Sequence, residues 1–172
     1  HYRREARIIP PPVDTQSFTS SSDRGDFYLM VGQLVRYKRP GLAVEAFNRM
    51  GKKLVVIGDG EMMPDIKRMA GPSIQIMGWQ PFSVIRDCYA RCRALIFPGQ
   101  EDFGIVPVEA MASGRPVIAY KRGGVLDSVM DEVTGLFFEH QTADALIDAV
   151  ERFEHMENDF DPRIISEHAK QF

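Results

Sequence analysis

Residues 94–119, ALIFPGQEDFGIVPVEAMASGRPVIA, contain the pattern that decides the fold. Ala94–Phe97 is a short apolar run that predicts a strand, and a Pro-Gly pair ends it. The stretch Val106–Ser113 predicts a helix, with Gly114 in place to stop it. A second apolar run, Pro116–Ala119, predicts the next strand. Two strands joined by a helix in this way favour a parallel sheet.

The same alternation of strand and helix continues on both sides of this unit. Strands are expected at 27–31, 54–57, 74–77 and 136–138, and helices at 40–50, 62–70, 82–93, 126–131, 143–155 and 162–171. The strands are apolar throughout, as strands covered by helices on both faces must be. The predicted fold class is therefore α/β: a Rossmann-like doubly wound parallel sheet in an α/β/α sandwich.

The first 25 residues differ in composition from the rest of the chain. Residues 1–25 are expected to be a linker, with a strand from a preceding domain near Ile8 and Ile9, because Pro10–Pro12 forbids helix and Ser17–Gly25 is small and polar. The domain proper is placed at 26–172. Since the first residue is not Met, the chain is expected to be a piece of a longer protein.

The composition argues against several classes of function. The chain has 172 residues, a formal net charge of -3 and no basic excess, so nucleic-acid binding is not expected. No apolar run reaches the roughly 18–20 residues that a membrane-spanning helix needs. Cys88 and Cys92 share one face of a predicted helix and are expected to be buried or half-buried thiols. His140, His155 and His168 lack metal-ligand spacing, so no metal site is expected.

The segment Glu101–Glu109 lies where a doubly wound sheet binds its ligands, beyond the carboxyl end of a strand. The amides of Gly104, Ile105 and Val106 begin a helix, so they have no partners within it and favour an anion. Glu101 in the preceding loop can meet a ligand. Glu109 can accept hydrogen bonds from paired hydroxyls such as those of a ribose. Taken singly, each acid is also explained as a solvated loop or helix residue.

These residues carry a resemblance to a known family. Glu101 and Glu109 are separated by seven residues, and their segment resembles the E-x7-E motif of GT-B glycosyltransferases of family GT4. The resemblance extends over about residues 8–150, and it implies the C-terminal, donor-binding domain of a GT-B enzyme similar to bacterial or archaeal mannosyltransferases of polysaccharide assembly. Further matching motifs follow in family order: Gly32–Lys38, Gly58–Gly60, Gly78-Trp79, Ala112–Val117, Gly123–Val125 and Val133–Leu136.

The resemblance implies a reaction and a set of roles. A hexose would move from a nucleoside diphosphate, with GDP-mannose as the leading donor, to a hydroxyl acceptor with retention and without a metal or other cofactor. Lys38 would stabilise the departing diphosphate and Glu101 would contact the hexose, as the two catalytic residues. Glu109 would hold the ribose. The residues expected to bind the donor are Gly32, Gln33, Lys38, Gly78, Glu101, Phe103, Gly104, Ile105 and Glu109.

Two departures from the family pattern matter. Gln33 stands where the family usually has Arg, and it brings no charge, so Arg36 or Arg39 is expected to compensate. The family's N-terminal domain, with the acceptor site and a catalytic histidine, is absent, so this chain alone is expected to be inactive in transfer. The implied partners are that domain and a lipid-linked or saccharide acceptor. The implied location is the cytoplasm, and the cytoplasmic face of the inner membrane is one implied site there.

Other interpretations stay open. A nucleotide-sugar epimerase of the GT-B fold and a degenerate, non-catalytic nucleotide-binding module are the alternatives, and Gln33 favours the second. Asp159-Phe160-Asp161 resembles the metal motif of the other glycosyltransferase fold, but Asp161 before Pro162 is interpreted as a helix N-cap. Trp79 is interpreted as a packing residue at a strand end.

Overall fold

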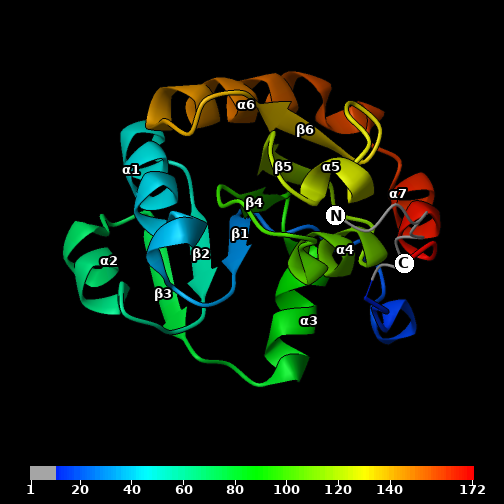
Figure 1. Ribbon diagram of the computed structural model, residues 1–172, viewed down its shortest axis with the longest axis horizontal. Coiled ribbons are helices and arrows are strands. Elements are labelled where there is room, and N and C mark those ends of the chain that lie inside the picture. Colours follow the sequence, from blue (N-terminus) through cyan, green and yellow to red (C-terminus); the bar gives the residue numbers. More distant parts are fainter. Residues whose placement is uncertain (1–10) are drawn as a thin grey trace, which may run out of the picture.

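Six short apolar segments within residues 11–172 form one parallel sheet at the centre of the molecule (Figure 1). The computed structural model describes residues 11–172, so the strand expected near Ile8 and Ile9 lies outside the described residues. The strand order is β3-β2-β1-β4-β5-β6, so the order reverses between β1 and β4. The strands are β1 (Tyr28–Val31), β2 (Leu54–Ile57), β3 (Ile74–Gly78), β4 (Leu95–Phe97), β5 (Val117–Tyr120) and β6 (Gly135–Phe138).

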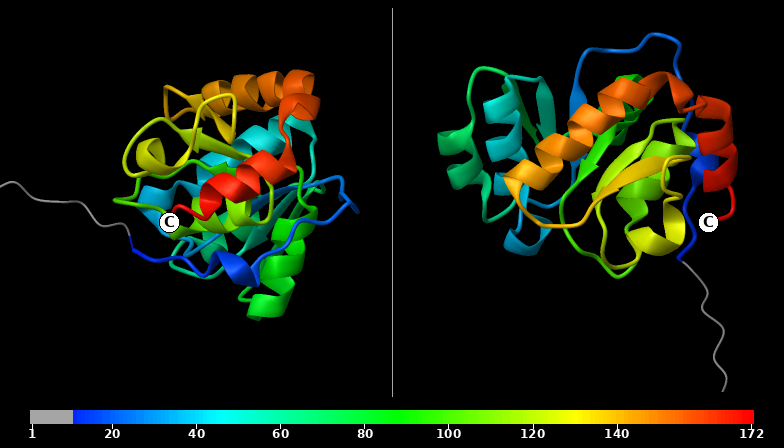
Figure 2. Two further views of the ribbon diagram at one scale, coloured as in Figure 1. Left: turned by 90° about the vertical axis from the view of Figure 1, so that its right-hand side faces the viewer. Right: turned by 90° about the horizontal axis from the view of Figure 1, so that it is seen from above.

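Helices cover both faces of this sheet (Figures 1 and 2). On one face α1 packs against α2 and α6, and on the other α4 packs against α3, α5 and α7. The predicted Rossmann-like doubly wound α/β/α sandwich is therefore confirmed. The helices are α1 (Pro40–Met50), α2 (Met63–Met69), α3 (Phe82–Arg91), α4 (Ile105–Ala112), α5 (Val125–Ser128), α6 (Ala143–Met156) and α7 (Pro162–Ala169).

The apolar strands and helix faces account for the core. Every residue of β2 is buried, as a central strand with helices on both sides requires. Tyr28 at the start of β1 packs edge-to-face against Phe47 of α1 and Phe153 of α6. Aromatic pairs in this geometry add roughly 0.5–1.5 kcal/mol to the free energy of burial. These contacts fix α1 and α6 on the same face of the sheet.

Several helices end earlier than the sequence pattern predicts, among them α3, α5 and α7. α3 ends at Arg91 because Cys92 adopts extended backbone, and α5 ends at Ser128 because Val129 is also extended. The interpretation of Asp161 as an N-cap is confirmed, since its side chain accepts a hydrogen bond from the Arg163 amide at the start of α7. Cys92 is buried and Cys88 is half-buried, as expected.

The described part of the expected linker, residues 11–25, packs along the domain (Figure 2). The Val13 amide donates to the Phe172 carbonyl, and Phe18 is buried against Tyr89 and Phe82 of α3. The buried Arg115 guanidinium donates to the Ser21 carbonyl at 2.6 Å. This segment therefore contributes to the core, while the boundary at residue 26 stays a prediction.

Candidate functional site

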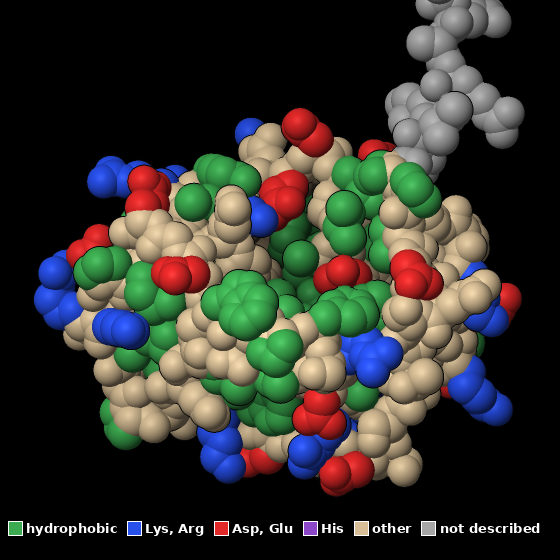
Figure 3. Space-filling model, turned by 90° about the horizontal axis from the view of Figure 1, so that it is seen from below, with side chains coloured by type: hydrophobic (Ala, Val, Ile, Leu, Met, Phe, Trp, Pro, Cys, Tyr) green, Lys and Arg blue, Asp and Glu red, His purple; other side chains and the backbone are tan. Residues whose placement is uncertain are grey.

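Two loops meet at the carboxyl ends of β1 and β4, which are neighbours in the sheet. The first loop ends in the short 3-10 helix η2 (Arg36–Lys38), and the second leads from β4 to α4. Gly99 lets them approach, because a Cβ atom at this position would lie 2.7 Å from Lys38 Cα. Figure 3 looks onto this edge of the molecule, where apolar and acidic side chains surround a hollow.

Lys38 and Glu101 form an ion pair where the two loops meet. Lys38 Nζ lies 3.0 Å from Glu101 Oε1, and their side chains are 15% and 21% exposed. The Oε1 atom is buried, and within residues 11–172 no N–H or O–H group reaches it with hydrogen-bond geometry. The lysine charge is therefore balanced by the carboxylate, and an anionic ligand entering here would compete with Glu101 for Lys38.

The start of α4 lies beside this ion pair. Gly104 is the N-cap residue, with φ of 88°, and it provides no side-chain cap. The amides of Gly104, Ile105 and Val106 have no hydrogen-bond acceptor within the described residues. These residues line a cavity of about 550 Å³ together with Lys38, Glu101 and Phe103. Uncapped amides and the positive end of the helix dipole make such a position favourable for an anion.

A pair of glycines holds the Glu101 loop in place. The Gly124 amide donates to the Glu101 carbonyl at 2.8 Å. A Cβ atom on Gly124 would overlap the Asp102 carbonyl oxygen and Phe103 Cα, and one on Gly123 would overlap the Glu101 carbonyl oxygen. The sequence motif Gly123–Val125 is thereby explained by backbone packing, since no side chain fits between the two loops.

Glu109 lies one helical turn beyond Ile105, so the two residues share a face of α4. Its Oε2 atom accepts a hydrogen bond of 2.9 Å from the Tyr89 hydroxyl of α3. Burial raises the pKa of the Glu109 carboxyl above its ordinary value, and the hydrogen bond from Tyr89 opposes this rise. Glu109 does not line the cavity around Lys38 but lies farther along the helix.

The remaining candidate residues occupy neighbouring strand ends. Gly32 follows β1 with φ of 141°, and a Cβ atom there would lie 3.4 Å from Lys38 Nζ. Gln33 is exposed, and Gly78 ends β3 with φ of 69° in open space. Neither Gln33 nor Gly78 lines the cavity around Lys38. The interpretation of Trp79 as a packing residue is wrong, because the loop after β3 leaves it 75% exposed.

Sequence reasoning missed a second, adjoining cavity of about 590 Å³, which also contains Glu101. Gln141, from the loop before α6, accepts a hydrogen bond from Arg39 Nε at 3.1 Å and donates one to the Pro98 carbonyl at 2.9 Å. It thereby links the loops after β1 and β4, and no sequence motif marks it. The other lining residues are Arg36, Tyr37, Arg39, Gln100 and Asp102.

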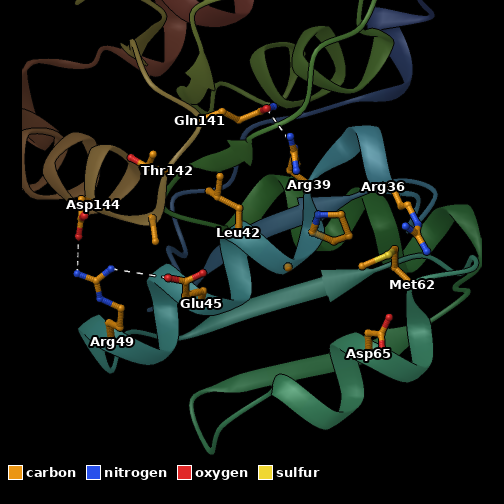
Figure 4. Close-up of a pocket in the computed structure, with 13 residues that line it drawn as sticks. Arg36, Arg39, Leu42, Glu45, Arg49, Met62, Asp65, Gln141, Thr142 and Asp144 are labelled. Atoms are coloured by element: carbon orange, nitrogen blue, oxygen red, sulfur yellow. Dashed lines mark hydrogen bonds and ion pairs between the residues drawn. The ribbon is translucent and has the colours of Figure 1, made fainter.

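The expected compensation for Gln33 concerns Arg36 and Arg39. Both lie at this second cavity and at a third, of about 670 Å³, between the starts of α1 and α6 (Figure 4). Arg39 points toward Gln141, whereas Arg36 is exposed and lies 3.8 Å from Glu61. Two guanidinium groups are therefore available near Glu101, outside the cavity that contains Lys38.

The described residues 11–172 contain neither a metal-ligand cluster nor a membrane-spanning helix. No cluster of three or more His, Cys, Asp or Glu side chains has an arrangement suited to a metal ion. None of the helices in this range combines the length and apolar character needed to cross a bilayer.

The family model described as glycosyl transferases group 1 matches residues 14–172. The chain belongs to this family. The fold is thus that of a glycosyltransferase-family domain with a Rossmann-like core.

Individual relatives agree with this assignment. An uncharacterized glycosyltransferase of Methanocaldococcus jannaschii is 28% identical over 175 residues, which cover 99% of this chain and 49% of the relative. The structure of Anabaena HepE in complex with UDP and glucose matches 96% of this chain and 51% of that protein, with a TM-score of 0.80 and 17% identity. Sucrose-phosphate synthase from Thermosynechococcus elongatus matches 96% of this chain and 47% of that protein, with a TM-score of 0.82 and 24% identity.

The two solved structures show the fold, which is that of GT-B glycosyltransferases. The chain spans about half the length of the curated relative it matches over nearly its whole sequence.

Proposed function

We propose that this chain is the donor-binding domain of a retaining glycosyltransferase that moves a hexose from a nucleoside-diphosphate sugar to a hydroxyl acceptor. The observation that carries the proposal is the Lys38–Glu101 ion pair at 3.0 Å beside the uncapped start of α4. A cation and free amides suit a diphosphate, and a carboxylate at the same point suits the hydroxyls of the attached sugar.

Each side of this site has its own role. Lys38 and the amides of Gly104 and Ile105 bind the diphosphate and stabilise the negative charge that grows as the bond from sugar to phosphate breaks. Glu101 contacts the hexose beside the Phe103 and Gly104 backbone. Gly32 leaves room for the phosphates beside Lys38. The acceptor hydroxyl then bonds to the anomeric carbon on the face that the phosphate leaves, and the phosphate takes its proton.

Glu109 holds the ribose hydroxyls in this proposal. Its position on the same face of α4 as Ile105 places it along the helix from the diphosphate amides. No metal is assigned a role, because Lys38 and the helix amides supply the positive charge.

The finer assignments rest on motif resemblance. We propose membership of family GT4, GDP-mannose as donor, and a lipid-linked or saccharide acceptor in polysaccharide or glycolipid synthesis, bound by a preceding domain. The cytoplasm is the proposed location, at the inner membrane face if the acceptor is lipid-linked. The structural neighbour HepE was solved with UDP and glucose, so UDP-glucose is the donor against which GDP-mannose has to be compared.

Calorimetric titration with GDP, UDP and ADP tests the proposal. We expect saturable binding of one of them, abolished by Glu109→Ala. No binding at millimolar nucleotide would instead favour the degenerate module. Transfer by the longer protein, with the anomeric configuration of the product determined, separates a retaining transferase from an epimerase.

A further inference from the structure

Tyr89 and Glu109 connect the last turn of α3 to the middle of α4. The Tyr89 hydroxyl donates to Glu109 Oε2 at 2.9 Å. Tyr89 is fully buried, and its ring packs edge-to-face against Phe18 with 5.8 Å between the ring centroids. The ring therefore has one position, and its hydroxyl fixes the orientation of the carboxylate.

This hydrogen bond engages only one of the two carboxylate oxygens. Within residues 11–172 no group donates a hydrogen bond to Glu109 Oε1. Glu109 is half-buried and shares the face of α4 that carries Ile105, one of the residues at the Lys38 cavity. A carboxylate that is held at one oxygen and free at the other is ready to accept hydrogen bonds from a ligand.

We propose that Tyr89 is a positioning residue of the donor site, whose hydroxyl orients Glu109 so that Oε1 accepts hydrogen bonds from the ribose hydroxyls of the nucleoside diphosphate. The inference rests on the proposed function, in which Glu109 holds the ribose. Tyr89 itself does not touch the ligand. It acts through the carboxylate, in the same way that second-layer hydrogen bonds orient the ligands of other sites.

The hydrogen bond also affects the charge of Glu109. Burial raises the pKa of this carboxyl, and the bond from Tyr89 is the influence that lowers it. α3, α5, α7 and η1 (Thr15–Ser17) pack against α4, and among the titratable groups of the described residues the Tyr89 hydroxyl is the one that hydrogen-bonds Glu109. Loss of the hydroxyl therefore raises the pKa of Glu109 further. When the pH is lowered, the variant's affinity for the nucleotide then begins to fall at a higher pH than that of wild type.

The chain offers a matched control for a test of this role. The Tyr28 hydroxyl donates to Glu154 Oε1, also at 2.9 Å, and Tyr28 is also buried. Tyr28 is the first residue of β1, at the opposite end of the strand from the site. Tyr28→Phe thus removes the same kind of bond away from the site, and both phenylalanine variants keep the packed ring.

The experiment is calorimetric titration of wild type, Tyr89→Phe and Tyr28→Phe with GDP, UDP and ADP and with their 2′-deoxy forms, after thermal melting has verified folding. We expect Tyr89→Phe to weaken binding of the preferred ribonucleotide about tenfold, as loss of a hydrogen bond to a charged group does. Its binding of the 2′-deoxy form changes less, its affinity begins to fall at a higher pH, and Tyr28→Phe binds like wild type.

Two results would overturn the inference, and they distinguish failure of the Tyr89 role from failure of the proposed function. If wild type binds a nucleotide and Glu109→Ala abolishes this binding, but Tyr89→Phe keeps wild-type affinity and pH dependence, Tyr89 has a structural role only and the proposed function stands. If wild type binds none of the nucleotides, the proposed function fails and the inference fails with it.

Discussion

Lys38 Nζ lies 3.0 Å from Glu101 Oε1, and this ion pair joins the loops that follow two neighbouring strands, β1 and β4. The strand order reverses between β1 and β4, which is where doubly wound sheets open a crevice for ligands. The fold therefore brings a cation and a carboxylate from separate parts of the chain to its natural binding position.

Replacing Lys38 is expected to weaken nucleotide binding. Lys38→Met removes the cation that faces the diphosphate, so affinity for the preferred nucleoside diphosphate falls by about tenfold to a hundredfold, as loss of a charge-assisted contact does. Calorimetry measures this change. Lys53→Met is the control, because Lys53 pairs with Asp26 before β2, away from the site. Equal affinities of Lys38→Met and wild type would contradict this role.

Replacing Glu101 is expected to have the opposite effect on a nucleotide that carries no sugar. Glu101→Gln removes the negative charge that competes for Lys38, so the affinity for the diphosphate rises a few-fold, on the order of 1 kcal/mol or less for this partly exposed pair. Transfer by the longer protein falls at the same time, because the hexose loses its contact. Titrations at low and high salt verify that the gain is electrostatic.

The pH dependence of stability reports the environment of Glu109. Burial raises the pKa of its carboxyl, so the folded state binds this proton more tightly than the unfolded chain does. The charged form thus costs stability above the folded pKa, and the cost disappears below the unfolded pKa of about 4.3. Glu109→Gln is expected to raise the melting temperature at pH 7, with the gain lost on acidification through pH 4, while nucleotide affinity falls.

Glu154→Gln is a control for which the expected change in melting temperature has the opposite sign. Although burial acts to raise the pKa of Glu154, hydrogen bonds from Lys52 and Tyr28 keep it below its ordinary value. Its charged form therefore stabilises the fold above the unfolded pKa, and Glu154→Gln is expected to lower the melting temperature at pH 7. Thermal melts of both variants between pH 3 and pH 8 test these two expectations. Changes of the same sign in the two melting temperatures at pH 7 would contradict this account.

Because the site loops lie close together, one methyl group added at Gly124 is expected to lower the stability of the fold. Gly124→Ala forces the Asp102 carbonyl and Phe103 away, so we expect the free energy of unfolding to fall by about 1–3 kcal/mol, as overpacking does. Gly41→Ala in α1 is the control, because its Cβ meets only Met69 at ordinary contact distance. That variant is expected to be stabilised by about 0.5–1 kcal/mol. Urea unfolding measures both, and a neutral Gly124→Ala would show that the loops can separate.

The packing of the segment before β1 predicts that it contributes to stability. Phe18 is buried against Tyr89, whereas its other ring partner, Phe82, is 50% exposed. Phe18→Ala is expected to lower the free energy of unfolding by about 3 kcal/mol. Phe82→Ala should cost about 1 kcal/mol or less, because much of its surface is already in water. Similar costs for the two variants would contradict the packing described here.

Local patterns in the sequence accounted for most of the fold. α1 and β2 have the bounds that apolar periodicity and the turn residues predict, because Pro40 suits a first helical turn and Gly51 stops the helix. α3 and α5 end early because extended residues follow them, and nothing in the pattern of apolar residues marks those positions.

Less of the candidate site could be predicted, because much of it depends on contacts between distant segments. The motif spacing pointed to Glu101 and Glu109. It did not point to Tyr89, which donates to Glu109, or to Gln141, which donates to the Pro98 carbonyl, because both belong to other elements. Trp79 was misjudged because an aromatic residue at a strand end says nothing about whether a neighbouring element covers it. Side-chain pairing across a fold is a tertiary property that a single sequence does not display.

A crystal structure of this chain with GDP, UDP or ADP bound tests the central claim most directly. The account predicts that the diphosphate accepts hydrogen bonds from the Gly104 and Ile105 amides and from Lys38, with the ribose hydroxyls on Glu109. A nucleotide bound elsewhere on the domain, with the Lys38–Glu101 pair intact and the start of α4 unoccupied, would contradict it.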